Sequence, residues 1–324
     1  MSSKDVSIII RVRNEAEALR KLLKLIDAQE TEFDYEIIVV DSDSIDDTQK
    51  VAEENGCYIL NIKPSNFSWG RGLNMGIERS NGKYCILVSA HCYPAKNDWI
   101  DKLVKPLIEN KKIAATYGRQ IPLRDVDLFE EVELKLIFPQ KEKTRTPISN
   151  ANACIRREIW EKNRFNEKLK SGEDVEWAMK VRKRGYLIKY VPEAVVYHSH
   201  RRNLKYIYNK WYWRGRVNVN LLKDEMKVIK IISNNKLLSN GISWLFFLAK
   251  YIEWVGHTTI YCLERKKFRE IWKVPFYEVI RWHAFYRGLK DGLADIRKKR
   301  EIDSTEQFSP HIPLFIQKFE KILK

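Results

Sequence analysis

The sequence predicts an α/β protein with a mainly parallel sheet, helices on both faces of that sheet, and a basic, mostly helical C-terminal region. Short apolar runs alternate with helical segments through the first 200 residues, a spacing typical of parallel strands joined by helices. After residue 201 the strand-like runs end, and Lys and Arg alternate with Trp and Tyr. A chain of 324 residues is long enough for two domains, which we place at residues 1–200 and 201–324.

The first half of the chain repeats a strand and a helix. Ser7–Val12 is a short apolar run typical of a buried strand, and the apolar residues of Leu19–Ile26 then recur at helical spacing, with Asn14 as the predicted cap. Ligands of such sheets bind beyond the C-terminal strand ends, so we expect the chemistry directly after the first, second and fourth strands. The further elements are predicted at Tyr35–Val40, Asp46–Asn55, Cys57–Ile62, Gly70–Ser80, Lys83–Val88, Asp98–Glu109, Ile113–Tyr117 and Val175–Arg184.

The net charge of +16 is unevenly distributed along the chain. Residues 201–300 contain 23 Lys and Arg against 8 Asp and Glu, whereas residues 1–200 contain 33 against 31. A composition with 31% charged and 44% hydrophobic residues is that of neither a disordered chain nor a polytopic membrane protein. The near-neutral first domain and the basic C-terminal region therefore need separate explanations.

Cysteine usage is typical of a reducing compartment. The five cysteines are odd in number and include no Cys-x-x-Cys pair, which argues against a disulfide scaffold and against a structural zinc site. The apolar run Ile8–Ile10 near the N-terminus is too short for a secretory signal. We therefore expect a cytoplasmic protein.

Three polar clusters are candidates for chemistry. Asp41 and Asp43 follow the second strand, where a carboxylate can accept hydrogen bonds from a nucleobase or from ribose hydroxyls; the neighbouring Asp46, Asp47 and Thr48 are interpreted as helix caps. Ser89 and His91 follow the fourth strand, and His198 and His200 follow the strand-like run Ala194–Tyr197. Three imidazoles at strand ends would converge on one divalent ion, although each histidine alone also fits an ordinary loop.

The third cluster is the carboxylate pair Glu173 and Asp174, which opens a predicted helix after Gly172. Paired carboxylates at a helix N-terminus are first interpreted as favourable partners of the helix dipole. A catalytic base at this position would require one of the two to face a pocket, and their spacing does not decide between these interpretations.

Taken together, these clusters resemble those of the family 2 glycosyltransferases, which have the GT-A fold. The resemblance covers residues 5–200, and four motifs carry it in order: a first strand followed by a polar Asn-Glu turn, an Asp-rich loop, a basic residue followed by Asn-x-Gly, and a Glu-Asp pair. A sub-pattern at Tyr117–Gln120 and Ser149–Ala153 is similar to bacterial enzymes that build surface polysaccharides, including rhamnosyltransferase-like members.

The resemblance implies a role for each matching residue. Asp174 would be the general base, and Glu173 beside it would hold an acceptor hydroxyl. The nucleotide and donor sugar would be bound by residues of the other motifs, namely Arg11, Arg13, Glu15, Asp41, Asp43, Arg71, Asn74, Ser89 and Asn152.

The chain departs from the family at the metal-binding Asp-x-Asp motif, where it has Ser89-Ala-His91. A neutral His91 would bind the metal together with His198 or His200, and imidazole favours Mn²⁺ over Mg²⁺. In a metal-free mechanism, protonated histidines would neutralise the diphosphate instead. The pH dependence separates the two: metal binding is lost as the pH falls, and the charge of a protonated histidine is lost as the pH rises.

The implied function is inverting transfer of a sugar from a UDP- or dTDP-sugar to a hydroxyl of a glycan or lipid-linked glycan, in the synthesis of bacterial surface polysaccharide such as capsule or lipopolysaccharide. Two alternatives belong to other classes. One is a non-catalytic scaffold that kept the fold. The other is a nucleotidyltransferase, which would usually show a Gly-rich loop after the first strand, where this chain has no glycine.

The composition of the C-terminal region predicts a surface that binds a partner. Its basic and aromatic residues suit an anionic membrane, as expected for a peripheral protein on the inner face of the cytoplasmic membrane. They also suit core packing or a homo-oligomer interface, and nucleic acid is the least favoured partner. The apolar stretch Ile242–Leu263 is interrupted by Lys250, Glu253 and His257, so it is a poor candidate for a membrane span.

Overall fold

The computed structural model describes residues 4–123, 126, 128–141, 148–169, 171–200, 204–222 and 236–297. Residues 301–324, which the sequence assigns to the C-terminal region, lie outside this set. The chain forms two compact units, one of Met1–Val126 with Glu133–His200 and the other of Asp127–Val132 with Arg201–Lys324.

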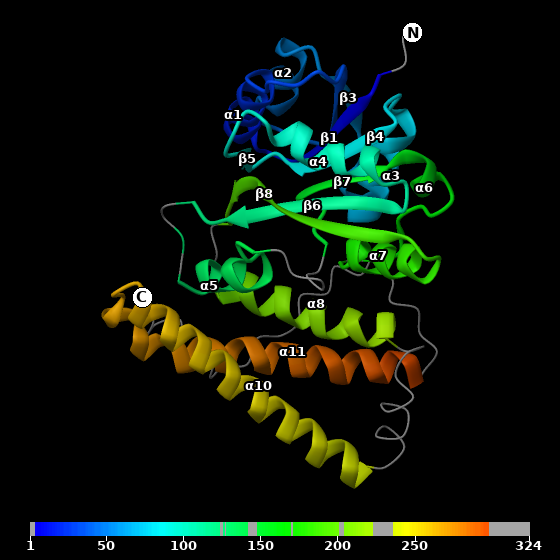
Figure 1. Ribbon diagram of the computed structural model, residues 1–324. Coiled ribbons are helices and arrows are strands. Elements are labelled where there is room, and N and C mark those ends of the chain that lie inside the picture. The colour runs from blue at the N-terminus through cyan, green and yellow to red at the C-terminus, as the bar shows by residue number, and fades with distance from the viewer. Residues whose placement is uncertain are drawn as a thin grey trace. The chain divides into compact units, whose positions relative to one another are not determined.

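The first unit is built on one mixed sheet (Figure 1). Among the described residues this sheet has eight strands in the order β3-β2-β1-β4-β7-β6-β8-β5. Its strands are β1 (Val6–Val12), β2 (Tyr35–Asp41), β3 (Tyr58–Asn61), β4 (Tyr84–Ser89), β5 (Cys92–Pro94), β6 (Ile113–Ile121), β7 (Asn152–Arg156) and β8 (Leu187–His198).

The parallel part of the sheet is centred on β1, which lies between β2 and β4. All seven residues of β1 are buried, as expected for a strand that helices cover on both faces. In its register Val12 pairs with Asp41 and Arg11 pairs with Ser89. The segments after these three strands therefore begin at one edge of the sheet, as the sequence indicates.

Two strands that the sequence analysis missed, β5 and β7, run antiparallel to their neighbours. Both are short, with three and five residues, so neither shows a clear alternating pattern. The strand β8 has 12 residues, of which only Ala194–Tyr197 was recognised, because Lys189, Pro192 and Glu193 interrupt the apolar pattern. The antiparallel β7 brings its first residue, Asn152, beside Val88 at the end of β4.

The helices of the first unit pack their apolar faces on the sheet. In α1 the buried residues are Leu19, Leu22, Leu23 and Ile26, as predicted. The helices and helical turns of this unit are α1 (Ala16–Asp27), α2 (Thr48–Glu54), η1 (Pro64–Asn66), α3 (Trp69–Arg79), α4 (Trp99–Glu109), α5 (Leu128–Ile137), α6 (Arg157–Glu161) and α7 (Glu173–Lys183). The part of α5 up to Val132 belongs to the second unit.

The predicted cap of α1 was wrong. Asn14 has a left-handed backbone with φ of 51°, and its Oδ1 accepts a hydrogen bond from the Ile45 N–H. The Ala16 N–H instead donates to Asp46 Oδ2 at 3.2 Å, and Asp46 Oδ1 accepts from the Thr48 N–H at 3.1 Å. One carboxylate thus satisfies orphan N–H groups at the starts of both α1 and α2.

The second unit is helical, as predicted, and its described elements are α8 (Leu204–Leu222), α10 (Lys236–Glu264), η2 (Phe268–Lys273) and α11 (Val274–Arg297). Many of its basic and aromatic side chains pack against each other. The Arg281 guanidinium lies 3.6 Å from the centroid of the Trp254 ring, and Arg216 donates to Asp295 at 2.7 Å. Core packing therefore accounts for part of the basic-aromatic pattern.

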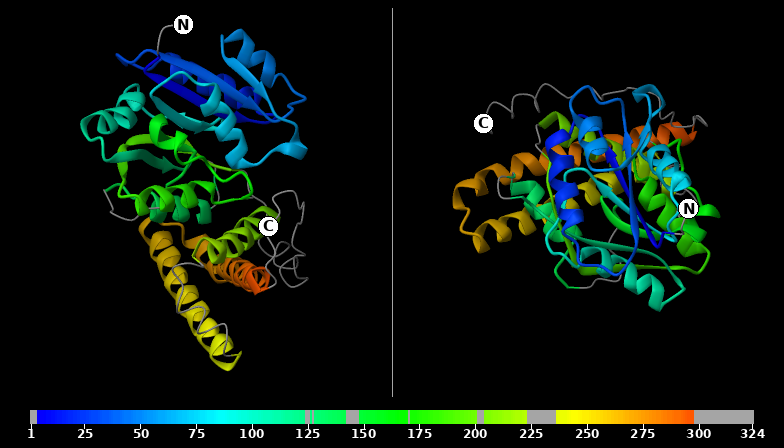
Figure 2. Two further views of the ribbon diagram at one scale, coloured as in Figure 1. Left: turned by 90° about the vertical axis from the view of Figure 1, so that its right-hand side faces the viewer. Right: turned by 90° about the horizontal axis from the view of Figure 1, so that it is seen from above.

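Helices α8 and α11 approach each other closely at glycines. A Cβ atom added to Gly288 would lie 2.0 Å from the Tyr212 carbonyl oxygen, and one added to Gly215 would lie 2.1 Å from that of Phe285. Both obstacles are backbone atoms, which cannot rotate away. Figure 2 also shows α10, in yellow, diverging from α11 away from the turn that joins them. Over the described part of the chain, the helices are too short or too polar for any to be a candidate membrane span.

We expect Gly288→Ala to destabilise the protein by about 1–3 kcal/mol, because the added methyl group overpacks the α8–α11 contact. Gly256→Ala in α10 is the matched control, since its new Cβ would meet no atom within 4 Å and alanine favours helices by up to about 1 kcal/mol. Urea unfolding followed by circular dichroism measures both. Equal stability of the two variants would contradict the close packing.

Candidate active site

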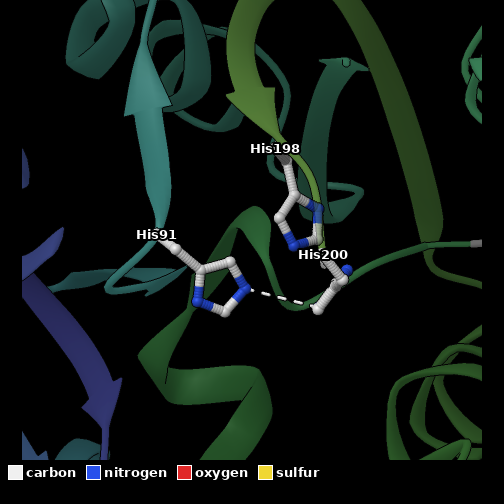
Figure 3. A group of neighbouring side chains, drawn as sticks. All are labelled: His91, His198 and His200. Carbon is white, nitrogen blue, oxygen red and sulfur yellow. Dashed lines mark hydrogen bonds between the residues drawn. The ribbon is translucent and has the colours of Figure 1, made fainter. Parts of the chain in front are cut away.

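Three histidines come together beside the edge of the sheet where β4 ends (Figure 3). His91 follows β4, whereas His198 and His200 lie at and after the end of β8, which pairs with β5 through Cys92 and His198. One nitrogen of each ring lies within 4.8 Å of the corresponding nitrogen of the others. The Nε2 atoms of His91 and His200 are 3.3 Å apart, and the rings of His91 and His198 stack at 5.1 Å between centroids.

Two of these imidazoles are oriented by acceptors behind them. His91 Nδ1 donates to Glu15 Oε1 at 2.7 Å, and His198 Nδ1 donates to Gln120 Oε1 at 2.7 Å. A neutral imidazole that donates from Nδ1 carries its lone pair on Nε2. Metal-binding histidines in proteins usually have this arrangement, with the second nitrogen held by a carboxylate or carbonyl. The histidine cluster thus fits a divalent transition metal by both its donor atoms and their support.

Glu15 lies beside His91. It was predicted among the donor-binding residues, but its carboxylate is the hydrogen-bond partner of His91. Gln120, which the sequence analysis noted only as part of a sub-pattern, plays the same part for His198. Neither role has a local sequence signal, because each partner lies more than 70 residues away along the chain.

The carboxylate pair lies at the start of α7, after Gly172 with its left-handed φ of 80°. Glu173 is 6% exposed, accepts a hydrogen bond from Asn150 Nδ2 at 3.3 Å, and lies 3.9 Å from an Arg11 guanidinium nitrogen. Asp174 is half-buried, and its Oδ1 accepts from the Val175 N–H at 2.8 Å. Since Arg11 is paired with Ser89 across β1 and β4, the carboxylate pair also lies near this sheet edge.

The environment of Glu173 favours its protonated form. Burial and, to a smaller extent, the negative charge of the neighbouring Asp174 raise the pKa of Glu173 to about 7, although Arg11 opposes the rise. Asn150 stabilises the charged form through its hydrogen bond. A carboxyl that titrates near neutral pH can exchange a proton under physiological conditions.

Arg11 connects this pair to an aromatic side chain. It is buried, its NH2 donates to the Asn150 carbonyl at 3.5 Å, and its guanidinium lies 4.9 Å from the Trp69 ring centroid. Trp69 is 45% exposed, so one part of this ring is available to a ligand. Trp69 is not among the site residues predicted from the sequence, although it stands at the start of α3 beside Arg71.

The Asp-rich loop is held by its own hydrogen bonds. Asp41 is fully buried, and its carboxylate accepts from the Ser44 N–H and hydroxyl and from Gln49 Nε2. Asp43 is exposed and has a left-handed φ of 58°. Arg13, after β1, is also exposed. Asp41 thus shapes the loop, whereas Asp43 and Arg13 present charged groups to solvent.

Asn74 and Asn152, both predicted to bind the donor, form hydrogen bonds within the protein. Asn74 donates to Phe165 O and Glu167 Oε1 and accepts from Trp160 Nε1 and the Phe165 N–H. Asn152 is fully buried, accepts from Trp99 Nε1, and donates to the carbonyls of Arg119 and Ala194. Both side-chain amides therefore join separate segments of the fold through hydrogen bonds.

Arg71 shares a hydrogen-bond partner, Glu167, with Asn74. Its Nε donates to Glu167 Oε2 at 3.1 Å and its NH1 to the Asn66 carbonyl at 3.2 Å. The side chain is 46% exposed, so the guanidinium still has a solvent-facing side. A ligand phosphate could replace Glu167 as its partner, because guanidinium binds both groups in the same way.

Comparison with known proteins identifies relatives of the first unit. An O-antigen chain rhamnosyltransferase of Salmonella typhimurium is 29% identical over 210 residues, which cover 60% of this chain and 66% of the relative. A glycosyltransferase of Haloferax volcanii is 25% identical over 209 residues, or 60% and 67% of the two chains. An O-antigen chain rhamnosyltransferase of Salmonella anatum is 25% identical over 58% and 64%. The chain thus spans less than two thirds of the two Salmonella relatives.

Solved structures share the fold. A mannosyltransferase from Pyrobaculum calidifontis, determined with GDP-Man and Mn²⁺, aligns with a TM-score of 0.59 at 16% identity and covers 91% of this chain and 88% of its own. Glucosyl-3-phosphoglycerate synthase from Mycobacterium tuberculosis, determined with Mn²⁺, UDP-glucose and phosphoglyceric acid, aligns with a TM-score of 0.52 at 20% identity over 68% and 79%.

The profile of the family described as glycosyl transferase family 2 matches residues 7–190. This match spans more than half of the chain and includes the strand ends, the histidine at the fourth strand and the Glu173–Asp174 pair. With the architecture described above, it shows that the chain is a member of glycosyltransferase family 2 with the GT-A fold.

Proposed function

We propose that the protein transfers a sugar, with inversion, from a nucleoside diphosphate sugar to a hydroxyl of a glycan or lipid-linked glycan. The observation that carries this proposal is the placement of the histidine cluster and the Glu173–Asp174 pair around one edge of the sheet. The histidine cluster suits the leaving diphosphate, and the Glu173–Asp174 pair suits the attacking hydroxyl. Residues 1–200 would then contain the whole reaction site.

The donor would bind over the strand ends. The exposed Arg13 and Asp43 and the half-exposed Trp69 offer charge, hydrogen bonds and an aromatic face at that edge. Asp41 would act by shaping the loop that contacts the nucleobase, since its own carboxylate is occupied by Ser44 and Gln49. The solved relatives in complex with GDP-Man and with UDP-glucose support a nucleotide-sugar donor.

Asp174 would act as the general base. Its carboxylate would take the proton of the acceptor hydroxyl while that oxygen attacks the anomeric carbon. The bond from that carbon to the diphosphate breaks in the same step, and the nucleoside diphosphate leaves with the bonding electrons. Glu173, fixed by Arg11 and Asn150, would hold the acceptor hydroxyl beside Asp174. Such a direct displacement inverts the configuration and needs no covalent intermediate.

His91, His198 and His200 would hold a divalent cation. Imidazole donors supported at Nδ1 favour Mn²⁺ over Mg²⁺, and relatives of the same fold were determined with Mn²⁺. When bound, such a cation supplies electrostatic stabilisation of the charge on the leaving diphosphate. Glu15 and Gln120 would keep the two rings in the orientation this binding needs.

The relatives support a proposal for the sugar and for the class of acceptor. Both Salmonella proteins are O-antigen chain rhamnosyltransferases, which supports transfer of a deoxyhexose in the synthesis of bacterial surface polysaccharide. The match to glycosyl transferase family 2 argues against a nucleotidyltransferase. The lack of a Gly-rich loop after the first strand also argues against that class.

We expect Asp174→Asn to lower turnover by about 10²- to 10⁴-fold, the usual contribution of a general base, while binding of the nucleoside diphosphate is retained. The matched control is Glu176→Gln on the same helix, whose carboxylate pairs with Lys180. Turnover is measured as release of nucleoside diphosphate in the presence of acceptor glycan. An activity of Asp174→Asn within about threefold of wild type would show that the base is another residue.

We expect Mn²⁺ to bind the nucleotide-free protein more tightly than Mg²⁺, and His91→Ala to weaken this binding by at least about tenfold. The control is His257→Ala, which removes an exposed histidine of α10. Calorimetric titration with each metal salt measures the affinity. Because neutral imidazole is the ligand, Mn²⁺ affinity should fall as the pH is lowered from 7.5 to 5.5. Nucleotide binding that is indifferent to EDTA and improves at low pH would favour protonated histidines instead.

We expect Glu173→Gln to change how stability depends on pH. In the folded protein Glu173 keeps its proton up to about pH 7, whereas its ordinary pKa is 4.5. Between these values the unfolded chain loses a proton that the folded protein retains, so Glu173 destabilises the fold as the pH rises from 5 to 7, by about 1 kcal/mol per pH unit. Urea unfolding at several pH values should show this slope for wild type relative to Glu173→Gln, and parallel curves would refute it.

A further inference from the structure

One face of α10 packs inside the second unit, and its other face is exposed and apolar. On the inner face Thr258 donates to Glu278 of α11, Trp254 contacts Trp282, and Cys262 is buried. On the outer face the exposed apolar residues are Ala249, Ile252, Gly256, Ile260 and Leu263, and the exposed Glu253, His257 and Glu264 lie along one side of them. At 3.6 residues per turn these five positions fall within an arc of about 80°, so they form one continuous stripe.

The stripe continues into the turn that follows α10. Phe268 and Trp272 in η2 are 61% and 48% exposed, and Leu263 at the end of the stripe is 51% exposed. Large apolar side chains rarely gather on the surface of a protein without a partner. We call Leu263, Phe268 and Trp272 the apolar tip.

Cationic side chains surround the apolar tip. Residues 263–273 contain five Lys and Arg against two Glu. Lys267 pairs with Glu131, and Lys273 pairs with Glu270. Lys266 and Arg269 are exposed and, among the residues that the structure describes, have no acidic group within 4 Å. Two positive charges next to the apolar tip are thus available to an external partner.

We propose that the apolar tip and the two cations Lys266 and Arg269 attach the protein to an anionic lipid bilayer. The combination of Phe, Trp and Leu with flanking Lys and Arg is that of an interfacial helix, whose apolar side enters the boundary between headgroups and acyl chains. Tryptophan prefers this depth, because its ring is apolar and its N–H is polar. The positive charge complements phosphate headgroups, each cation near the surface contributing to binding.

The structure favours attachment in the plane of the membrane. No described helix qualifies as a membrane span, so α10 would rest on one leaflet along its exposed stripe. A second copy of the chain is the other occupant that an apolar stripe would suit. The unpaired cations disfavour it, because a symmetric contact would bring Lys266 and Arg269 of two copies close together. The attachment goes beyond the transfer reaction and does not depend on it.

Cosedimentation of the full chain with lipid vesicles tests the proposal. Vesicles of phosphatidylcholine alone are compared with vesicles that also contain phosphatidylglycerol. We expect clear binding to the mixed vesicles, much weaker binding to the neutral ones, and weaker binding at high salt. The variant Lys266→Gln/Arg269→Gln should bind the mixed vesicles about 10- to 30-fold less tightly.

Two further variants keep the test specific. Phe268→Ser/Trp272→Ser should weaken binding to both kinds of vesicle, and circular dichroism verifies that it folds. Lys50→Gln/Lys111→Gln removes the same charge from exposed positions of the first unit and should bind as wild type does. Turnover with a water-soluble acceptor should be equal in all three variants, so a failure of attachment is distinguished from a failure of catalysis.

Three outcomes would overturn the proposal. One is no binding to either kind of vesicle. The second is an equal loss of binding in Lys50→Gln/Lys111→Gln and in Lys266→Gln/Arg269→Gln, which would indicate an effect of net charge alone. The third is a dimer in light scattering that Phe268→Ser/Trp272→Ser dissociates, without vesicle binding, which would assign the apolar tip to a contact between two copies.

Discussion

The parallel pairing of β1 between β2 and β4 is the constraint on which the candidate site depends. Its register brings Val12 to Asp41 and Arg11 to Ser89, so three loops with different chemistry begin at neighbouring points. Because both faces of β1 are buried, a shift by one residue would exchange the side chains that pack on the two faces and would separate Arg11 from Ser89. The core thereby determines which polar groups meet at the edge.

As a proposed metal site, the histidine cluster would have softer donor atoms and less negative charge than a pair of aspartates. Three imidazoles bring no negative charge to a bound ion, whereas a pair of aspartates would bring two. The Glu15 carboxylate contacts Nδ1 of His91 and lies behind that ring rather than in the cluster. In the proposed site, a cation would keep more of its positive charge for an anionic ligand, and the imidazole donors would favour transition metals over Mg²⁺.

The strand ends that form the site edge of the sheet were predicted from the sequence. Many hydrogen-bond partners of the side chains at that edge were not. Asp41 and His91 were predicted to lie at this edge because each follows an apolar run, and a buried parallel strand has a strong local sequence pattern. The internal hydrogen bonds of the Asn74 and Asn152 amides were not predicted, since their partners lie 91 and 42 residues away. The short antiparallel strands β5 and β7 were missed for the same reason: their stability comes from neighbours that are distant in the chain.

The turn after β1 and the loop after β2 are joined by reciprocal hydrogen bonds. Asn14 donates to Ser44 Oγ and accepts from the Ile45 N–H, while the Glu15 N–H donates to Thr48 Oγ1. Glu15 in turn orients His91. If the nucleotide binds as proposed and reorders the Asp-rich loop, the change would reach the support of the histidine cluster through these hydrogen bonds. Nucleotide and cation would then bind with linked free energies, each changing the affinity of the other by the same factor.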